Sequence, residues 1–367
     1  MTLGFRVKAL RINAILVLKL KSQGCRQILL EIKKRQVLTK EISQIQAKIL
    51  KELLVDGRKT FTEIAQKTGL QKEIVSKEYR ELIEIGVIKG ATIHINYRGF
   101  GYKAVANLLI NVDPSQADQL LEFVRKMPDI YAVYSYCPRG NIRVITTLRT
   151  LQQLDEVKDA IKSHFSILSM RSVIWTDVKE MHENLVLSKQ TESTTETQTN
   201  HRVENKKMAR LPSKEIQIDE TDSKITEALS QDGLIPLDKI AEQIGTSIST
   251  IKKRFDRLKE NRLLKVTIQI DPMTLGYRAI AIFYVTYALR EDSFSTIERI
   301  RQIPDVISIM KTSGDYDLQV YAMIRDIDQL LSIQDEFAKI TGVANVDMDI
   351  TRMLDKWPTP KQYMSTF

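Results

Sequence analysis

The sequence predicts an α+β protein made as a tandem repeat, in which each copy joins a helical domain to a βαββαβ sandwich domain. Three observations predict this: an internal repeat with a period of about 175 residues, helical apolar spacing at the start of each copy, and alternating strands and helices in the remainder. Because solenoid repeats span only about 20–50 residues, this long period indicates duplication of a two-part unit.

Four pairs of matching segments carry the repeat. Their shared positions are mostly apolar, glycine and proline residues, which determine folds. The pairs are KILKELLVDG (48–57) with KITEALSQDG (224–233), EIAQKTG (63–69) with KIAEQIG (239–245), TIHINYRGFGYKA (92–104) with TIQIDPMTLGYRA (267–279), and MPDIYAV (127–133) with IPDVISI (303–309).

Each copy begins with three short predicted helices. In the first helix Ile49, Leu53 and their apolar neighbours follow helical spacing, which ends at Asp56-Gly57. A glycine, Gly69 in copy one and Gly245 in copy two, separates the second helix from the third. Three short helices with a glycine-containing turn form a (winged) helix-turn-helix pattern. We assign it to residues 42–100 and 217–272.

The second part of each copy alternates strands with helices. The order βαββαβ is that of a ferredoxin-like sandwich, with helices on one face of an antiparallel sheet. We assign it to residues 101–182 and 273–352. In copy two the predicted strands are 278–288, 306–312, 318–322 and 344–350 and the predicted helices 294–302 and 327–337, and copy one has the same order over 103–178.

Three segments lie outside the repeat: a basic N-terminal extension (1–41), a linker (183–216) and a C-terminal tail (353–367). The linker has almost no large apolar residues over 188–215, so it cannot bury enough surface to order itself. Residues 1–40 carry ten Lys and Arg and one acid, which equals the net charge of +9 for the whole chain. This extension suits an arm on DNA phosphates; a solvated extension and translation from too early a start codon are the alternatives.

Composition excludes several classes of protein. The two cysteines, Cys25 and Cys137, and the four histidines are scattered, so neither a disulfide framework nor a metal site is expected. No nucleotide-binding loop, nucleophile elbow or zinc-protease motif occurs, and we expect no catalytic residues and no cofactor. The apolar run 14–18 is too short to span a bilayer, so we expect a cytoplasmic protein without a membrane partner.

The domain order resembles that of the Lrp/AsnC family of prokaryotic transcription regulators. The resemblance rests on the helix-turn-helix, the hinge sequence DPMTLGY (271–277) and the turn SGDYDL (313–318), and it covers nearly all of 217–352 and, more loosely, 42–180. It implies double-stranded DNA as partner, dimerisation and further assembly through the sandwich domains, and an amino-acid effector. Two units in one chain imply an intramolecular pseudo-dimer.

The third helix of copy two is the predicted DNA-reading element. Over 247–261 its charge is +3, and Ser247 is the predicted N-cap. Ile251, Phe255 and Leu258 face inward at helical spacing, which leaves polar and basic side chains for a groove. A solvated basic face is the alternative interpretation. The candidate DNA-binding residues are Ser247, Ser249, Thr250, Lys252, Lys253, Arg254 and Arg257.

The corresponding helix of copy one is a weaker candidate. Over 71–84 four glutamates outnumber Lys72, Lys77 and Arg80, which gives a charge of −1. Gln71 takes the place of a short polar cap, and Glu78 stands where copy two has Arg254. We expect this helix to contribute less to DNA contact and to serve mainly as a dimerisation half.

The turn at 312–320 is the predicted effector site. The resemblance implies that Gly314, Asp315 and Asp317 lie near a ligand, where the carboxylates could hold an α-amino group. Ordinary turn chemistry is the alternative. In copy one, Asn141 and Arg143 replace the two acids, so a site there is altered or absent.

Two other functions remain open on sequence. Sirohaem decarboxylases share the two-part architecture and carry an Asn-His-Arg run on the hinge strand. Here the run reads Asn96-Tyr97-Arg98 in copy one and Asp271-Pro272-Met273 in copy two, and the second sandwich strands lack histidine. The other alternative is an interaction protein whose helix-turn-helix units have lost DNA contact.

Overall fold

The protein is described by a computed structural model over residues 39–127, 129–136, 142–181, 184–187, 217–288, 293–359 and 362–364. Within these residues the same order of elements occurs twice. We call 42–182 unit 1 and 217–352 unit 2. The leader over 1–38 and the linker stretch 188–216 lie outside the described residues.

The helical domain of each unit, here called its head, contains the three predicted helices. Ser43 begins the first helix of head 1 with a reciprocal capping box, and Asp219 does the same in head 2. Gly69 and Gly245 end the second helices in the left-handed conformation, which confirms the predicted turns. The helices are α3 (Gln44–Val55), α4 (Phe61–Thr68) and α5 (Lys72–Glu84) in head 1, and α8 (Glu220–Gln231), α9 (Leu237–Ile244) and α10 (Ile248–Glu260) in head 2.

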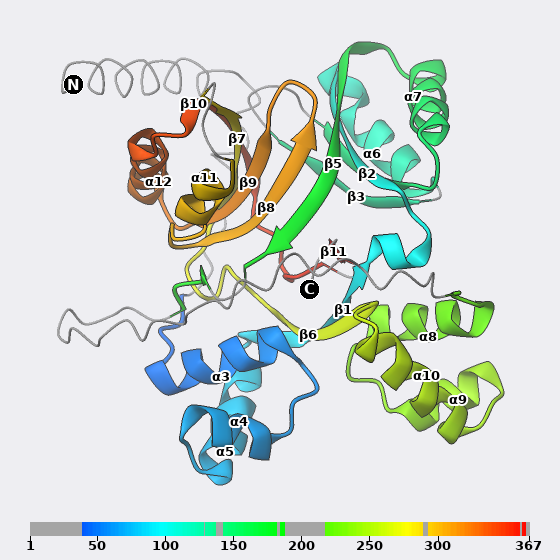
Figure 1. Cartoon of the computed structure of the whole chain (residues 1–367), viewed down its shortest axis with the longest axis vertical. Coiled ribbons are helices and arrows are strands. Elements are labelled where there is room, and N and C mark those ends of the chain that lie inside the picture. Colours follow the sequence, from blue (N-terminus) through cyan, green and yellow to red (C-terminus); the bar gives the residue numbers. More distant parts are fainter. Residues whose placement is uncertain are drawn as a thin grey trace.

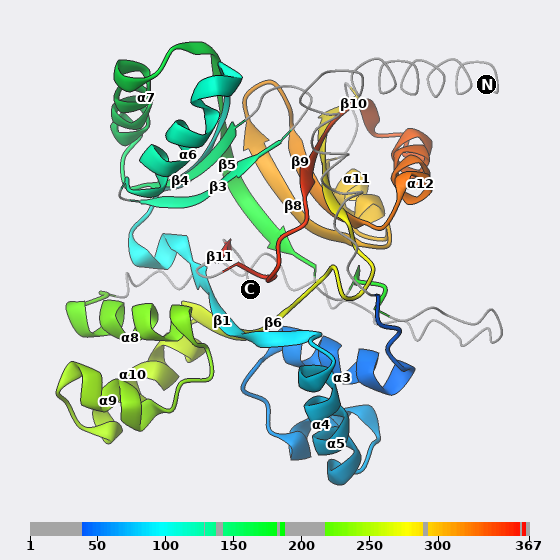
Figure 2. The same ribbon diagram turned by 180° about the vertical axis from the view of Figure 1, so that it is seen from behind.

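A two-stranded ribbon joins the heads. Strand β1 (Ile88–Asn96) pairs antiparallel with β6 (Leu264–Ile270), and Thr92 lies directly opposite its counterpart Thr267. Each head packs on the strand of the other unit: Ile93 of β1 belongs to the core of head 2, and Ile268 of β6 to the core of head 1. The heads therefore lie side by side under one shared ribbon (Figures 1 and 2).

Both sandwich domains have the predicted βαββαβ order. Unit 1 contains β2 (Ala104–Val112), α6 (Ala117–Arg125), β3 (Ile130–Ser135), β4 (Ile142–Leu148), α7 (Gln152–His164) and β5 (Ile167–Glu180), with short 3₁₀ turns η1 (Tyr97–Phe100) and η2 (Pro114–Gln116). Unit 2 contains β7 (Ala279–Tyr287), α11 (Ser293–Ile300), β8 (Val306–Ser313), β9 (Leu318–Ile324), α12 (Ile327–Lys339) and β10 (Val343–Arg352).

The two sandwich sheets form one continuous sheet of eight strands. Its order is β10-β7-β9-β8-β5-β2-β4-β3, and the units join where β5 pairs antiparallel with β8. The outer strands also meet, because Thr351 of β10 donates to the carbonyl of Ser135 on β3 at 2.7 Å. The helices cover the outside, α6 and α7 on one flank and α11 and α12 on the other (Figure 1). The inner faces of both units therefore share one interior.

The C-terminal segment, which the sequence places outside the repeat as a tail, is bound to the ribbon. Backbone groups of Trp357 and Ile270 exchange hydrogen bonds at 2.8 and 2.9 Å, and the Trp357 side chain is buried. Strand β11 (Gln362–Met364) then pairs parallel with β1 as the third strand of the ribbon. Three residues are too few for a strand pattern to be recognised from sequence, and only pairing with the edge of the ribbon makes this segment a strand.

Candidate nucleic-acid interface

Helix α10 lies in head 2, the part of the molecule remote from the sandwich sheet (Figure 1). Ser247 caps it as predicted: its hydroxyl accepts from the Thr250 amide at 3.1 Å. Ile251, Phe255 and Leu258 are buried, which confirms the predicted inward face. The helix is thus held by its apolar side, and its opposite side is available for contacts outside the chain.

The exposed side of α10 carries hydroxyls first and then lysines. Ser249, Lys252 and Lys253 are exposed, and Thr250 is half-buried beside the cap. The hydroxyls of Ser249 and Thr250 each lie 2.8 Å from that of Ser247. This arrangement places hydrogen-bonding groups at the N-terminus of the helix and two cations one turn along it. Such groups can read base edges and neutralise phosphates.

Arg254 and Arg257 instead reach toward the start of α8. Arg254 donates to Asp219 at 2.6 Å and to Asp222 at 3.1 Å, and Arg257 donates to the other oxygen of Asp222. Asp222 is fully buried, so these cations offset its charge. The bond from the Asp222 amide and the bond from Arg254 lower the pKa of Asp219, although desolvation opposes them. The two arginines therefore tie α10 to α8, a role that the sequence pattern did not reveal.

Helix α5 presents a different surface. Gln71 makes no side-chain cap, as expected, and Lys72, Lys77 and Arg80 are exposed. Arg80 donates to Ser76 on its own helix at 2.9 Å. Glu73, Glu81 and Glu84 are also exposed. The exposed surface of this helix thus mixes both signs of charge, whereas the exposed side of α10 is basic.

A direct contact between the heads was not anticipated from the sequence. Arg58, in the turn after α3, donates to the carbonyls of Gly233 and Ile235 in head 2 at 2.9 and 2.6 Å. Its guanidinium also lies 5.1 Å from the ring centroid of Phe255, within α10. Lys259 of α10 pairs with Asp56 at 2.8 Å. Leu234 stands at the Arg58 position in unit 2, so this contact is made from one side only.

The predicted effector turn lies at the junction between the units. Gly314 has φ of 145°, and Asp315 is exposed. Asp317 has an intramolecular role, because its carboxylate accepts from the Tyr287 amide at 2.7 Å. Beside the turn is a small hollow that both units line. Its residues are Leu109, Ser169, Arg171 and Val173 of unit 1 and Asp315 and Tyr316 of unit 2.

One sequence interpretation at this turn is wrong. Arg143 does not take the place of an acid in the copy-one turn, because it lies within β4 and is fully buried. Strand register makes it the counterpart of Gln319: Arg143 pairs with Leu109 of β2, and Gln319 pairs with Tyr284, the corresponding residue of β7. Asn141 lies outside the described residues.

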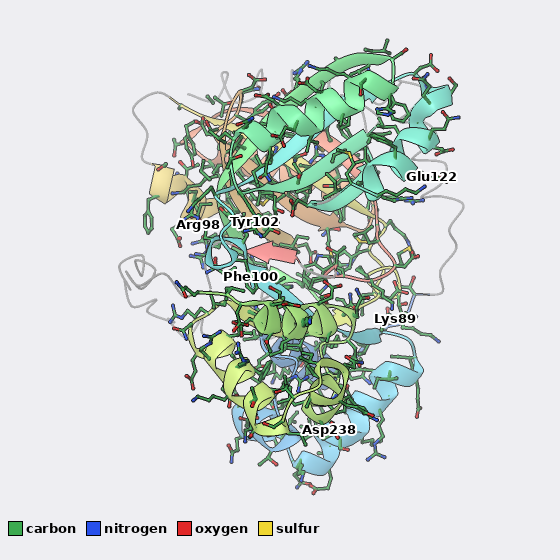
Figure 3. The ribbon with its side chains drawn as sticks, turned by 90° about the vertical axis from the view of Figure 1, so that its right-hand side faces the viewer. Lys89, Arg98, Phe100, Tyr102, Glu122 and Asp238 are labelled. Atoms are coloured by element: carbon green, nitrogen blue, oxygen red, sulfur yellow. The ribbon has the colours of Figure 1, made fainter. Side chains whose placement is uncertain are left out.

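The hinge residues that raised the decarboxylase alternative have structural roles here. Tyr97 is fully buried, and the Asn96 side chain donates to the Arg262 carbonyl at 3.4 Å and accepts from the Gly99 amide. Arg98 donates to the Thr176 carbonyl of β5. Figure 3 places Arg98 in the neck between heads and sandwiches, far from Asp238 on α9. Asp271, of the copy-two run, accepts from the Met273 amide.

Two features that would point to other functions do not occur in the described part of the chain. No group of three or more His, Cys, Asp or Glu residues there could hold a metal ion. No helix among the described residues is both long and apolar enough to cross a membrane.

Comparison with protein families finds matches in both units. The AsnC-type helix-turn-helix domain matches residues 218–259, and the Lrp/AsnC ligand binding domain matches residues 281–351. A winged helix-turn-helix DNA-binding family matches residues 42–89. The matched segments coincide with the two heads and with the sandwich of unit 2.

Individual relatives are shorter than this chain. The transcriptional regulator FL11 of Pyrococcus furiosus is 29% identical over 144 residues, which are 39% of this chain and 94% of FL11. The regulator LrpA of Pyrococcus horikoshii is 33% identical over 131 residues, 35% of this chain and 92% of LrpA. Among solved structures, the siroheme decarboxylase NirDL matches with a TM-score of 0.55 at 15% identity, covering 88% of this chain and 94% of that one. That likeness concerns the fold alone.

Proposed function

We propose a mode of DNA reading from one premise: the chain belongs to the Lrp/AsnC family of helix-turn-helix transcriptional regulators. It is a DNA-binding regulator of transcription with a ligand-binding domain. Our proposal is that two units of this family are fused in one chain and that α10 of head 2 enters a major groove. The observation that carries it is the exposed basic side of α10, set against the mixed charge of α5.

Different side chains of α10 would contact base edges and phosphates. Ser249 and Thr250, near the capped N-terminus, suit contacts to base edges, where hydroxyls act as donors and acceptors. Lys252 and Lys253 suit phosphates, and each phosphate contact adds salt dependence to binding. Arg254 and Arg257 would support the helix through Asp219 and Asp222 while their remaining donors face the DNA backbone.

The test compares matched positions in the two heads. Lys253 and Lys77 are counterparts, and both are exposed. In gel-shift titrations on DNA from the protein's own upstream region, we expect Lys253→Ala to weaken binding several-fold and to reduce the slope of log affinity against log salt by about one. Lys77→Ala is the matched control and should change little. Equal losses would contradict the asymmetry, and no binding by the wild type would favour an interaction protein.

We propose an amino acid as the effector, bound in the hollow between the units. Asp315 supplies a carboxylate for the α-amino group, and Arg171 supplies a guanidinium for the α-carboxylate. Gly314 gives the turn its conformation, and Asp317 holds the turn through the Tyr287 amide. Calorimetric titration with the individual amino acids tests this. Asp315→Asn should abolish heat of binding, and unchanged binding in that variant would place the effector elsewhere.

The remaining proposals concern assembly and location. The shared ribbon, the continuous sheet and the packing of each head on the strand of the other unit support an intramolecular pseudo-dimer. Membership of the family supports assembly into further homo-oligomers. Light scattering after gel filtration gives the number of chains. A regulator that binds DNA in a prokaryotic cell would act in the cytoplasm.

We propose that the chain is not an enzyme. The structural roles of Asn96 and Tyr97 support this. Incubation with sirohaem should leave no Soret absorption with the protein after gel filtration, and a retained Soret band would reopen the decarboxylase alternative.

A further inference from the structure

A buried ion pair connects the two units inside the shared interior. Arg143 on β4 of unit 1 and Asp349 on β10 of unit 2 are both 0% exposed, and Arg143 Nη2 lies 3.2 Å from Asp349 Oδ2. Arg143 also donates to the hydroxyls of Tyr284 and Tyr321, which both belong to unit 2. The Tyr284 hydroxyl in turn donates to Asp349 at 2.9 Å. The hydrogen bonds from the two terminal nitrogens of this cation therefore all go to groups of unit 2.

The surroundings keep this arginine charged. Its guanidinium lies 4.8 Å from the ring centroid of Tyr136 and 5.8 Å from that of Tyr134. Burial alone would lower the pKa of Arg143, but Tyr321, Tyr134 and Asp349 raise it above its usual value. An unpaired charge in such an interior is strongly destabilising.

The two units differ at the positions of this pair. Gln319 is the counterpart of Arg143, because the two pair with corresponding residues of the first sandwich strand of their units, Tyr284 and Leu109. Val173 is the counterpart of Asp349 by the same criterion, since Val173 pairs with Asn107 and Asp349 with Ile282. Unit 1 thus contributes a cation and no carboxylate, and unit 2 contributes a carboxylate and a neutral amide.

The contact that Gln319, the unit 2 counterpart of Arg143, makes with unit 1 involves only neutral groups. Gln319 of unit 2 accepts from the Trp175 indole at 2.9 Å and from the Asn107 amide at 3.2 Å, both in unit 1. The interior therefore has one ionic contact and one neutral contact, and only a pairing of unlike units supplies both.

We propose that the Arg143–Asp349 pair determines which units associate: the inner face of unit 1 accepts the inner face of unit 2 and rejects a second copy of itself. Two copies of unit 1 would bury both Arg143 side chains against Val173 and Leu109, without a carboxylate. Two copies of unit 2 would bury Asp349 against Gln319, without a cation. A buried charge without a partner disfavours the wrong pair of units more strongly than the loss of a favourable contact does. Each pseudo-dimer then contains one head of each kind.

The test separates the two units and measures which pairs they form on refolding. A protease site is inserted between residues 188 and 215 of the full chain, the purified protein is cleaved, unfolded in denaturant and refolded, and native mass spectrometry counts the three kinds of pair. In a statistical mixture the mixed pair is twice as abundant as each like pair; we expect it to be more than ten times as abundant as each like pair. A statistical mixture from the wild type would overturn the proposal. The measurement does not depend on DNA binding.

Variants assign the choice to the ion pair. The double change Arg143→Gln with Asp349→Val gives each position its counterpart's residue, and like pairs should then appear. Asn107→Ile, a counterpart exchange at the neutral contact, is the control and should leave the mixed pair dominant. Because a single change strands a charge and could prevent folding, the exchange Arg143→Asp with Asp349→Arg is a second arm, expected to restore the mixed pair. Mixed pairs undiminished in the first double variant, or like pairs in the second, would refute the proposal.

Discussion

At the residue scale, close backbone contacts set the positions of the heads. Gly57 and Gly233 follow the first helices of the heads, one residue after the C-cap, and each lies against the ribbon strand of the other unit. A Cβ at Gly233 would lie 2.7 Å from the Thr92 carbonyl oxygen, and one at Gly57 would lie 2.9 Å from the Thr267 carbonyl carbon. Neither glycine has a left-handed backbone conformation, so conformational freedom does not explain them. The lack of space for a Cβ is the reason that both positions need glycine.

Gly233→Ala is therefore expected to push head 2 away from the ribbon. We predict a loss of about 1–3 kcal/mol in the free energy of unfolding, typical of overpacking against an immobile neighbour. Urea denaturation measures it, and Gln231→Ala, at the exposed last residue of α8, serves as the control. If Gly233→Ala unfolded at the same urea concentration as the wild type, the backbone around Thr92 would have to move enough to accept the added methyl group.

At the element scale, head 1 restrains head 2. The turn after α3 contributes Arg58 and Asp56 to contacts with α10 and with the turn after α8. The exposed surface of α5 suits DNA poorly. Under the proposed function the heads therefore have unlike roles: head 2 contacts DNA and head 1 supports it.

Arg58→Ala is predicted to loosen the contact between the heads. Two hydrogen bonds from a charged donor and one contact with the Phe255 ring are lost, which we expect to cost about 1–3 kcal/mol. Hydrogen exchange should accelerate at the Gly233–Ile235 backbone, and DNA affinity should fall. Arg80→Ala removes an exposed cation from α5 as a control for charge. Unchanged exchange in Arg58→Ala would contradict the restraint.

Acid should weaken the attachment of α8 to α10. The folded pKa of Asp219 lies below its unfolded value, so its stabilising contribution is present above the ordinary aspartate pKa of about 3.9 and disappears as pH falls through the lower, folded value. The protection of α8 amides against hydrogen exchange, measured at a series of pH values across this acid range, should fall more steeply with falling pH in the wild type than in Asp219→Asn. Parallel profiles would assign the acid sensitivity to other groups.

At the scale of the whole molecule, the C-terminal segment fastens the ribbon. Trp357 is buried against β6, and β11 extends the ribbon beside β1, so one segment contacts the hinge strands of both units. Figure 2 shows β11 between the sandwich sheet and the ribbon.

Trp357→Ala should consequently destabilise the joint between the units. Removing a large buried aromatic side chain typically costs about 3–5 kcal/mol. Thermal denaturation should show a lowered midpoint, whereas Lys356→Ala, an exposed neighbour, should leave it unchanged. A small effect would mean that the segment only lies on the ribbon.

The sequence by itself determined the repeat, the element order and the inward face of α10. These follow from local periodicity, from glycines at turns and from Ser247, all of which act within a few residues of chain. The sequence also marked Lys252 and Lys253, because exposed charge on an amphipathic helix follows from spacing alone. Only the tertiary structure decided that Arg254 and Arg257 bind Asp219 and Asp222, that Arg143 is a buried partner of Asp349, and that the C-terminal segment forms a strand. The physical reason is that burial and pairing of charges depend on contacts between residues far apart in the chain, which a duplicated pattern of apolar residues does not encode.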